Sequence, residues 1–185
     1  MTFETFFLRQ LGWTPNNTLP AIIYRGALDD ARAGDAAEQF ETLFGRHGWP
    51  ARWRNGILDD HHYHSTAHEA LGFAKGSARL MLGGPKGVEV RVEAGDAALL
   101  PVGTGHCRLH ASDDFLVVGA YPPGQDFDIC RTEASPQMRA RMSQVVYPFR
   151  DPVGGAEGPM TRLWRKNAEP KEETWTRARI GVCGG

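Results

Sequence analysis

The stretch GILDDHHYHSTAHEALGFAKG, residues 56–76, carries the strongest indication of the fold and of a binding site. Four histidines lie within eight residues and are followed at once by a carboxylate: His61, His62, His64, His68 and Glu69. Imidazole nitrogens and carboxylate oxygens are ligands that divalent transition metals accept in proteins. The stretch therefore predicts either a metal site or a polar loop rich in imidazole.

Successive side chains of an extended strand point to opposite faces, so only some of these histidines can share one ion. His62 and His64 point to one side and His61 points to the other. A short turn then lets the chain run back antiparallel, so that Glu69 presents an oxygen to the same site and the adjacent His68 faces away. We therefore expect His61 and His68 to lie in solvent or at a subunit contact.

A second group of polar side chains follows in GDAALLPVGTGHCRLH, residues 95–110. Its glycines and proline predict a turn, a buried strand and a constrained corner over residues 101–105, which delivers His106 to the start of the next strand. By alternation, His106, Arg108 and His110 share one face of that strand. If His106 faces a metal inside a barrel, Arg108 and His110 line the same cavity.

Together the two stretches supply three imidazoles and one carboxylate, a ligand set that suits one divalent first-row ion such as iron, manganese, nickel or zinc. Two positions of an octahedron then remain for water or substrate. The cysteines Cys107, Cys130 and Cys183 are widely spaced and form no C-x-x-C pair, which argues against a thiolate zinc site or a disulfide framework. We expect Cys107 to be a buried small hydrophobe.

Short apolar or alternating runs, separated by glycine turns roughly every eight to twelve residues, fill residues 51–122. This pattern predicts a closed or double-sheet β architecture for a core domain over these residues. Residues 1–50 are then an N-terminal extension that packs a strand and a helix on the core, and residues 123–185 form a C-terminal helix and tail. A length of 185 residues fits one domain with extensions.

Two helices are expected outside this core. The first begins after Asp35 as N-cap and ends at Gly45 or Gly48. The second begins after Ser135, which is followed by a proline, and its methionines recur at helical spacing and are expected in the core. From about Lys166 the chain is polar and poorly patterned, which predicts a mobile tail or an arm laid on a neighbouring subunit.

Composition and charge limit the classes of partner that we expect this protein to bind. A hydrophobic fraction of 41% with 23% charged residues is ordinary for a soluble globular protein, and a net charge of -1 provides no field to attract a nucleic acid. The N-terminal MTFETFFLRQLGW carries Glu4 and no basic segment, unlike a signal peptide, and no stretch reaches the roughly 18 to 20 apolar residues that span a bilayer. We expect a cytoplasmic protein without nucleic-acid or membrane partners.

The two histidine-bearing stretches resemble the two sequence motifs of the cupin superfamily. The first motif matches without a gap at Gly56, His62, His64, Glu69 and Gly76. The second matches at Gly95, Pro101, Gly103 and His106, with His110 where the superfamily usually has asparagine. The chain also resembles the YjlB-like branch of small bacterial cupin-domain proteins in HYHSTAHE and FLVVGAYPPG, a branch that brings no settled activity with it.

The resemblance implies an all-β cupin jelly roll, a double-stranded β-helix barrel, with a few flanking α-helices. It implies one metal bound near the barrel axis by four ligands: His62, His64, Glu69 and His106. The departure at His110 leaves this ligand set intact but can alter the cavity wall. A single motif pair makes the chain a monocupin, and closing sheet edges against a partner predicts a homodimer.

Four further residues are candidates for the site, each with a structural alternative. Arg108 either captures a carboxylate or phosphate through bidentate hydrogen bonds or forms a structural ion pair. His110 either acts as a general acid or base, because its unperturbed pKa is about 6.5, or hydrogen-bonds a loop. Phe73 and Tyr121 either line the pocket or pack in the core.

The function expected from the sequence is that of a metal-dependent enzyme acting on a small anionic metabolite. Isomerase, decarboxylase and dioxygenase chemistry all remain open, because this fold hosts many unrelated reactions. The alternatives are a non-catalytic cupin module that binds or senses a small ligand, and a structural cupin without metal.

Overall fold

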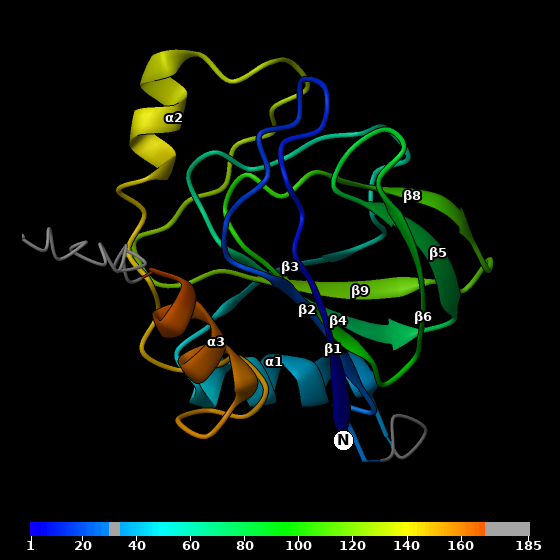
Figure 1. Cartoon of the computed structure of the whole chain (residues 1–185). Helices are drawn as coiled ribbons and strands as arrows, with labels where there is room; N and C mark the ends of the chain where they lie inside the picture. The colour runs from blue at the N-terminus through cyan, green and yellow to red at the C-terminus, as the bar shows by residue number, and fades with distance from the viewer. Residues whose placement is uncertain (30–33, 169–185) are drawn as a thin grey trace, which may run out of the picture.

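A computed structural model describes residues 1–29 and 34–168, and within them the chain is mostly β (Figure 1). The strands are β1 Thr2–Phe6, β2 Ala21–Arg25, β3 Ala51–Asn55, β4 Glu69–Lys75, β5 Ser77–Leu82, β6 Val88–Glu93, β7 Ala97–Leu100, β8 His106–Ala111 and β9 Leu116–Ala120. The helices are α1 Ala36–Arg46, α2 Pro136–Met142 and α3 Pro159–Ala168. Short strands separated by glycine turns are what the sequence pattern predicts.

The strands form two antiparallel sheets that pack against each other. The large sheet has the order β1-β2-β7-β4-β9-β3 and the small sheet has the order β6-β5-β8. Strands β1 and β2 precede residue 51 and yet belong to the large sheet, where Ile22 of β2 pairs with Leu99 of β7. Over the described residues the sheets remain separate hydrogen-bonded units, so the double-sheet alternative describes the observed architecture and no closed barrel is found.

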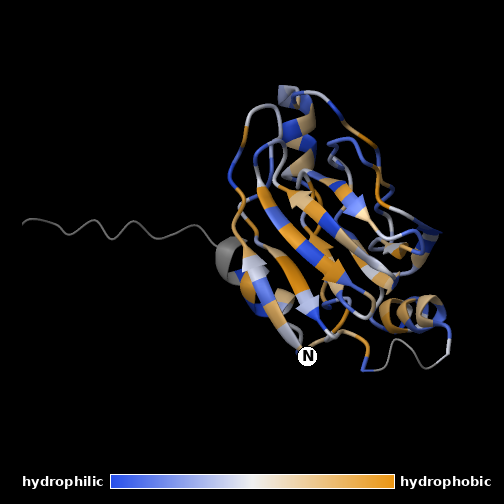
Figure 2. Cartoon of the chain, turned by 90° about the vertical axis from the view of Figure 1, so that its right-hand side faces the viewer, coloured by the Kyte–Doolittle hydropathy of each residue, from blue (hydrophilic) through white to orange (hydrophobic). Residues whose placement is uncertain are grey.

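The four central strands of the large sheet, β2, β7, β4 and β9, are buried on both faces because they send alternate residues into two cores. In β4, Ala70 and Ala74 join the core under α1 and α3, whereas Leu71 and Phe73 join the core between the two sheets. Along β6 of the small sheet, by contrast, the buried Val90 and Val92 alternate with exposed charged residues, and such alternation along strands is visible in Figure 2. A sheet covered on both sides needs nearly continuous apolar strands, which explains sequences such as AALL in β7.

Helix α1 closes one face of the large sheet. Asp35 is its N-cap, as predicted, and the carboxylate accepts a hydrogen bond of 2.9 Å from the Ala37 N–H. The helix packs Phe40 against β4, where a Cβ on Gly72 would lie 2.4 Å from the Phe40 ring. Glycine at residue 72 therefore allows the close approach of α1, and Gly48, at φ +83°, lies just beyond the helix end.

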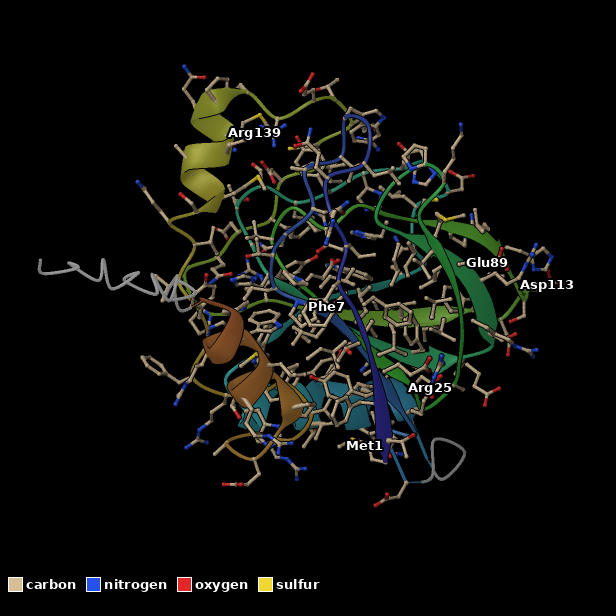
Figure 3. The ribbon with its side chains drawn as sticks, in the orientation of Figure 1. Met1, Phe7, Arg25, Glu89, Asp113 and Arg139 are labelled. Atoms are coloured by element: carbon tan, nitrogen blue, oxygen red, sulfur yellow. The ribbon has the colours of Figure 1, made fainter. Side chains whose placement is uncertain are left out.

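The two C-terminal helices differ from the expectations. Ser135 caps α2 as predicted, but none of its residues is buried, and Figure 3 shows Arg139 of α2 far from the sheets. The expectation that its methionines join the core is therefore wrong. Helix α3 was not predicted, although Met160 and Trp164 lie at helical spacing and are buried in the core under the large sheet.

Three expectations, the C-terminal tail, the homodimer and the cytoplasmic location, are not tested by this fold. The predicted tail lies largely in residues 169–185, which are outside the described residues. None of the helices in the described segments is long and apolar enough to cross a membrane. The homodimer and the cytoplasmic location stay predictions.

Candidate metal centre

Three buried histidines converge at one end of the space between the sheets. One ring nitrogen from each of His62, His64 and His106 lies within 4.8 Å of the others. Two backbone hydrogen bonds join His62 to His106, with N···O distances of 3.1 and 2.9 Å. The two histidine-bearing stretches of the sequence therefore meet directly, and this buried group can hold a metal ion.

The backbone fixes which nitrogen each ring presents. In every case Nδ1 lies beside a carbonyl oxygen, which can only accept, so Nδ1 carries the proton and Nε2 keeps its lone pair. The distances are 2.9 Å for His62 and 3.1 Å for His106. The acceptors are the carbonyl oxygens of Asp60 for His62, Asp128 for His64 and Thr104 for His106. Such contacts orient imidazole rings that ligate metals.

Glu69 brings a carboxylate beside two of these rings, His64 and His106. Its Oε1 accepts a hydrogen bond of 2.5 Å from the Tyr121 hydroxyl and lies 3.2 Å from His64 Nε2. Its Oε2 lies 3.4 Å from His106 Nε2 and, within the described part of the chain, is buried without a hydrogen-bond partner. A buried carboxylate oxygen left without a donor or a cation is costly, so Oε2 lacks the partner that an ion at this point supplies.

The electrostatics give His62, His106 and Glu69 the protonation states that a metal requires, whereas Glu69 favours on His64 the proton that an ion would displace. Burial lowers the pKa of His62, and it lowers that of His106 to about 3, so both rings are neutral near neutral pH. Burial raises the pKa of Glu69, but His64 and His106 outweigh it and lower the pKa to about 2. Burial also opposes charge on His64, yet Glu69 outweighs it and raises that pKa. Neutral imidazoles and an ionised carboxylate are the metal-binding forms.

A cavity of about 300 Å³ opens above these groups. Its walls come from β3, from the segment 56–58 that follows β3, and from the segment 127–129 that follows β9. The lining residues are Trp53, Arg54, Asn55, Gly56, Ile57, Leu58, His62, His64, Glu69, Leu71, His106, Tyr121, Phe127 and Ile129. The histidines and Glu69 therefore lie in a space that a small molecule can enter.

The other two histidines of the first stretch lie outside this group. His68 points away from the cavity, as expected, but it is fully buried, so its expected exposure is wrong. Its Nδ1 accepts a hydrogen bond from the Val102 N–H at 3.0 Å, and its ring centroid lies 4.8 Å from that of Trp164 in α3. The reason is that β4 pairs with β7 and β9, which directs residue 68 into the helix-covered core.

His61 and Cys107 form a separate contact beside the group. His61 is partly buried, and its Nε2 lies 3.5 Å from the Cys107 sulfur. Cys107 is buried, as expected of a small hydrophobe, and burial raises the pKa of its thiol.

Arg108 and His110 do not line the cavity, contrary to the expectation from strand alternation. The register of β5 against β8 passes from Leu80–Arg108 to Arg79–His110, so Leu109 is an extra residue in a bulge. A bulge shifts the residues beyond it to the opposite face, which leaves His110 exposed. The Arg108 side chain is 37% exposed, and its Nη2 lies 3.9 Å from the Asp59 carboxylate. The predicted cavity roles of both residues lose their geometric basis, whereas the contact with Asp59 fits the alternative that Arg108 forms an ion pair.

Of the two predicted aromatic residues, the structure brings one to the cavity. Tyr121 lines it, donates to Glu69 and accepts a hydrogen bond of 2.9 Å from the Trp53 indole N–H. Phe73 is fully buried in the core between the sheets, where its ring stacks with Phe115 at a centroid distance of 6.1 Å. It does not line the cavity.

The segment that follows β9 contains site residues that the sequence predictions missed. Phe127 and Ile129 line the cavity, and the Asp128 carbonyl holds His64. The Asp128 carboxylate accepts hydrogen bonds from the Ser65 N–H and hydroxyl, which ties this segment to the first histidine stretch. The alternation of acidic and apolar residues in DFDI, residues 126–129, is the sequence signal that places Phe127 and Ile129 on one face of an extended segment.

Comparison with known proteins gives one informative relative. The chain is 35% identical over 166 residues to a Bacillus subtilis (strain 168) protein named "Uncharacterized protein YjlB", a match that covers 88% of this chain and 97% of that protein. No model of a known protein family matches the chain.

Proposed function

Because the chain belongs to the protein family of Bacillus subtilis YjlB, whose name assigns no activity, we propose a function from the site of this chain itself. The protein is a metal-dependent cupin enzyme that acts on a small metabolite. Its ion is one divalent transition metal, iron, manganese, nickel or zinc, held by His62, His64, Glu69 and His106. The observation that carries the proposal is the convergence of three correctly oriented imidazoles on the unpartnered Oε2 of Glu69.

The residues fit such an ion in three independent respects. The ligand set contains three imidazole nitrogen donors and one anionic oxygen donor, which suits a first-row divalent metal. Each histidine is held by a backbone carbonyl through Nδ1, and Glu69 is held by Tyr121. The fourth donor, Glu69 Oε2, is buried with no other partner among the described residues.

The architecture supports the cupin assignment. Two antiparallel sheets pack face to face, and the two histidine motifs meet between them through the His62–His106 backbone pair. We propose that these sheets form the double-stranded β-helix that the sequence motifs imply. The metal then lies at the open end of that structure, next to the cavity.

The bound ion supplies a Lewis acid for isomerisation or decarboxylation, or a redox centre for dioxygenase chemistry if it is iron. The protein contributes binding and orientation. Tyr121 fixes one oxygen of Glu69, so that the other remains directed at the histidines. The apolar walls reduce access of water to the three imidazoles, which strengthens electrostatic interactions within the site.

Elemental analysis of the purified, tag-free protein by inductively coupled plasma mass spectrometry tests this proposal. We expect one of the four metals near one per chain, and its loss in the double variant His62→Ala, His64→Ala. His110→Ala is the matched control, because the same change at an exposed histidine leaves the metal content unchanged.

Circular dichroism of each variant separates loss of metal from loss of fold. If the folded wild-type protein takes up no metal after reconstitution, the proposal is wrong. If metal binds and a bound ligand is recovered unchanged, the binding or sensing module describes the protein.

A further inference from the structure

The upper walls of the cavity are built from large apolar side chains. Trp53 comes from β3, Leu58 from the segment after it, and Phe127 and Ile129 from the segment after β9. Leu71 of β4 forms part of the lining deeper in the space between the sheets. The lining side chains that carry possible metal ligands lie together at the base of the cavity: His62, His64, His106 and Glu69.

Three of these apolar side chains also form the mouth. Leu58 is 39% exposed, Phe127 is 40% exposed and Ile129 is 44% exposed. The Phe127 ring is held in place, because it stacks on Tyr121 at 4.7 Å with an interplanar angle of 14° and meets the His64 ring edge-on at 5.4 Å. Exposed apolar side chains gathered around a cavity mark a surface that an apolar ligand covers.

Positive charge near the mouth is already paired. Arg54 is the one lysine or arginine among the described lining residues, and both Nε and Nη2 donate to the Glu41 carboxylate, at 2.6 and 2.9 Å. Three other arginines belong to ion pairs in which at least one member is close in sequence to a lining residue. These pairs are Arg52 with Asp126, Arg108 with Asp59 and Arg131 with Asp60. A charged group on the body of a ligand would therefore face apolar walls without a partner, which is unfavourable.

We propose that the ligand of this site has an uncharged aromatic or branched aliphatic body and reaches the metal through one or two oxygen atoms. The inference rests on the proposed metal function and deepens it by naming the substrate class. A cavity of about 300 Å³ lies at the small end of ligand sites, so the body is of the size of a single substituted ring. Phe127 and Ile129 determine specificity, and an anionic body, which was expected from Arg108, is disfavoured.

Three compounds with the same chelating head test the substrate class: acetohydroxamic acid, benzohydroxamic acid and 4-carboxybenzohydroxamic acid. Their dissociation constants for the metal-loaded protein are measured by isothermal titration calorimetry. Burial of the ring makes benzohydroxamic acid bind about tenfold or more tightly than acetohydroxamic acid. The added carboxylate then weakens binding, because no free cation meets it.

Phe127→Ala tests the part of the wall that we assign to specificity. Its side chain is substantially exposed, so the substitution leaves the fold intact. We expect it to weaken benzohydroxamic acid several-fold and to leave acetohydroxamic acid unchanged. Phe149→Ala, at a phenylalanine that is 83% exposed and outside the cavity lining, is the matched control and changes neither constant.

The outcomes distinguish this inference from the proposed function. Equal affinities for the first two compounds in metal-loaded protein, or tighter binding of the carboxylated one, overturn the inference and leave the metal proposal standing. The same titrations are made with the double variant His62→Ala, His64→Ala. If wild-type protein takes up no metal but both proteins still prefer the ring-bearing compound, the metal proposal fails and the apolar substrate class is retained.

Discussion

The two faces of the large sheet are built from alternate residues of the same strands, and they serve different purposes. The face under α1 and α3 is filled by aromatic and aliphatic side chains such as Phe40, Phe44 and Trp164. The opposite face packs in the same way along most of its length, but at one end its apolar residues give way to Glu69 and a cavity. One face therefore provides stability, and the end of the other provides a site.

Two buried histidines on these opposite faces show which feature distinguishes the candidate site from the core. Burial contributes most to lowering the pKa of both His68 and His106, in each case to about 3. His68 lies against the rings of Trp164 and Tyr147 and accepts one backbone hydrogen bond. His106 instead lies with two further imidazoles and a carboxylate. Convergence of donors, rather than burial of a histidine, identifies the site.

The largest effect is expected from removing an aromatic side chain on the helix-covered face. Phe40→Ala leaves a cavity between α1 and β4 and should lower the free energy of unfolding by about 3 to 5 kcal/mol. Urea denaturation measures the change, and the folded variant should retain its full metal content. The exposed control Phe149→Ala should change the stability by less than about 0.5 kcal/mol. Loss of metal from folded Phe40→Ala would contradict the separation of the two faces.

An intermediate effect is expected where the cavity face supports the ligands. Tyr121→Phe removes the hydroxyl between Glu69 and Trp53, so metal affinity should fall about 10- to 100-fold. Competition with a chromophoric chelator measures the affinity. Tyr147→Phe is the matched control, because this tyrosine is exposed and lies beside His68 on the other face. Equal affinities in the two variants would show that Tyr121 does not position Glu69.

The smallest effect is expected when the same substitution, tryptophan to phenylalanine, is made on each face of the large sheet. Trp53→Phe removes an indole donor to Tyr121, and Trp164→Phe removes one to the Pro20 carbonyl at 3.0 Å. Each lost hydrogen bond should cost about 0.5 to 1.5 kcal/mol of stability, beyond any loss of packing. Only Trp53→Phe should weaken metal binding, and by less than Tyr121→Phe, because Trp53 acts through Tyr121. An equal loss of metal affinity in Trp164→Phe would contradict the assignment of metal binding to the cavity face.

Local patterns in the sequence predicted much of this fold. The N-cap at Asp35, the buried strand AALL and the opposite directions of His68 and Glu69 follow from capping and alternation, and the structure has all three. The meeting of His62, His64 and His106 was implied by the resemblance of the two stretches to the cupin motifs, and the structure brings the three rings together.

The features that were missed depend on contacts between distant segments. The bulge at Leu109 is set by pairing with β5, so alternation within β8 alone placed His110 on the wrong face. The burial of His68 depends on Trp164, which lies 96 positions further along the chain in a helix that was not predicted. The methionines of α2 likewise remain only half-buried, and Met142 reaches Gly103 of a distant segment, a contact that methionine spacing alone does not reveal.

The most direct test is the position of the ion in crystals of the metal-loaded protein, located by anomalous diffraction at the absorption edge of the metal found by elemental analysis. We expect one anomalous peak about 2.0 to 2.3 Å from Nε2 of His62, His64 and His106 and from an oxygen of Glu69. A peak at other residues, or metal-soaked crystals with no peak between these four side chains, would contradict it.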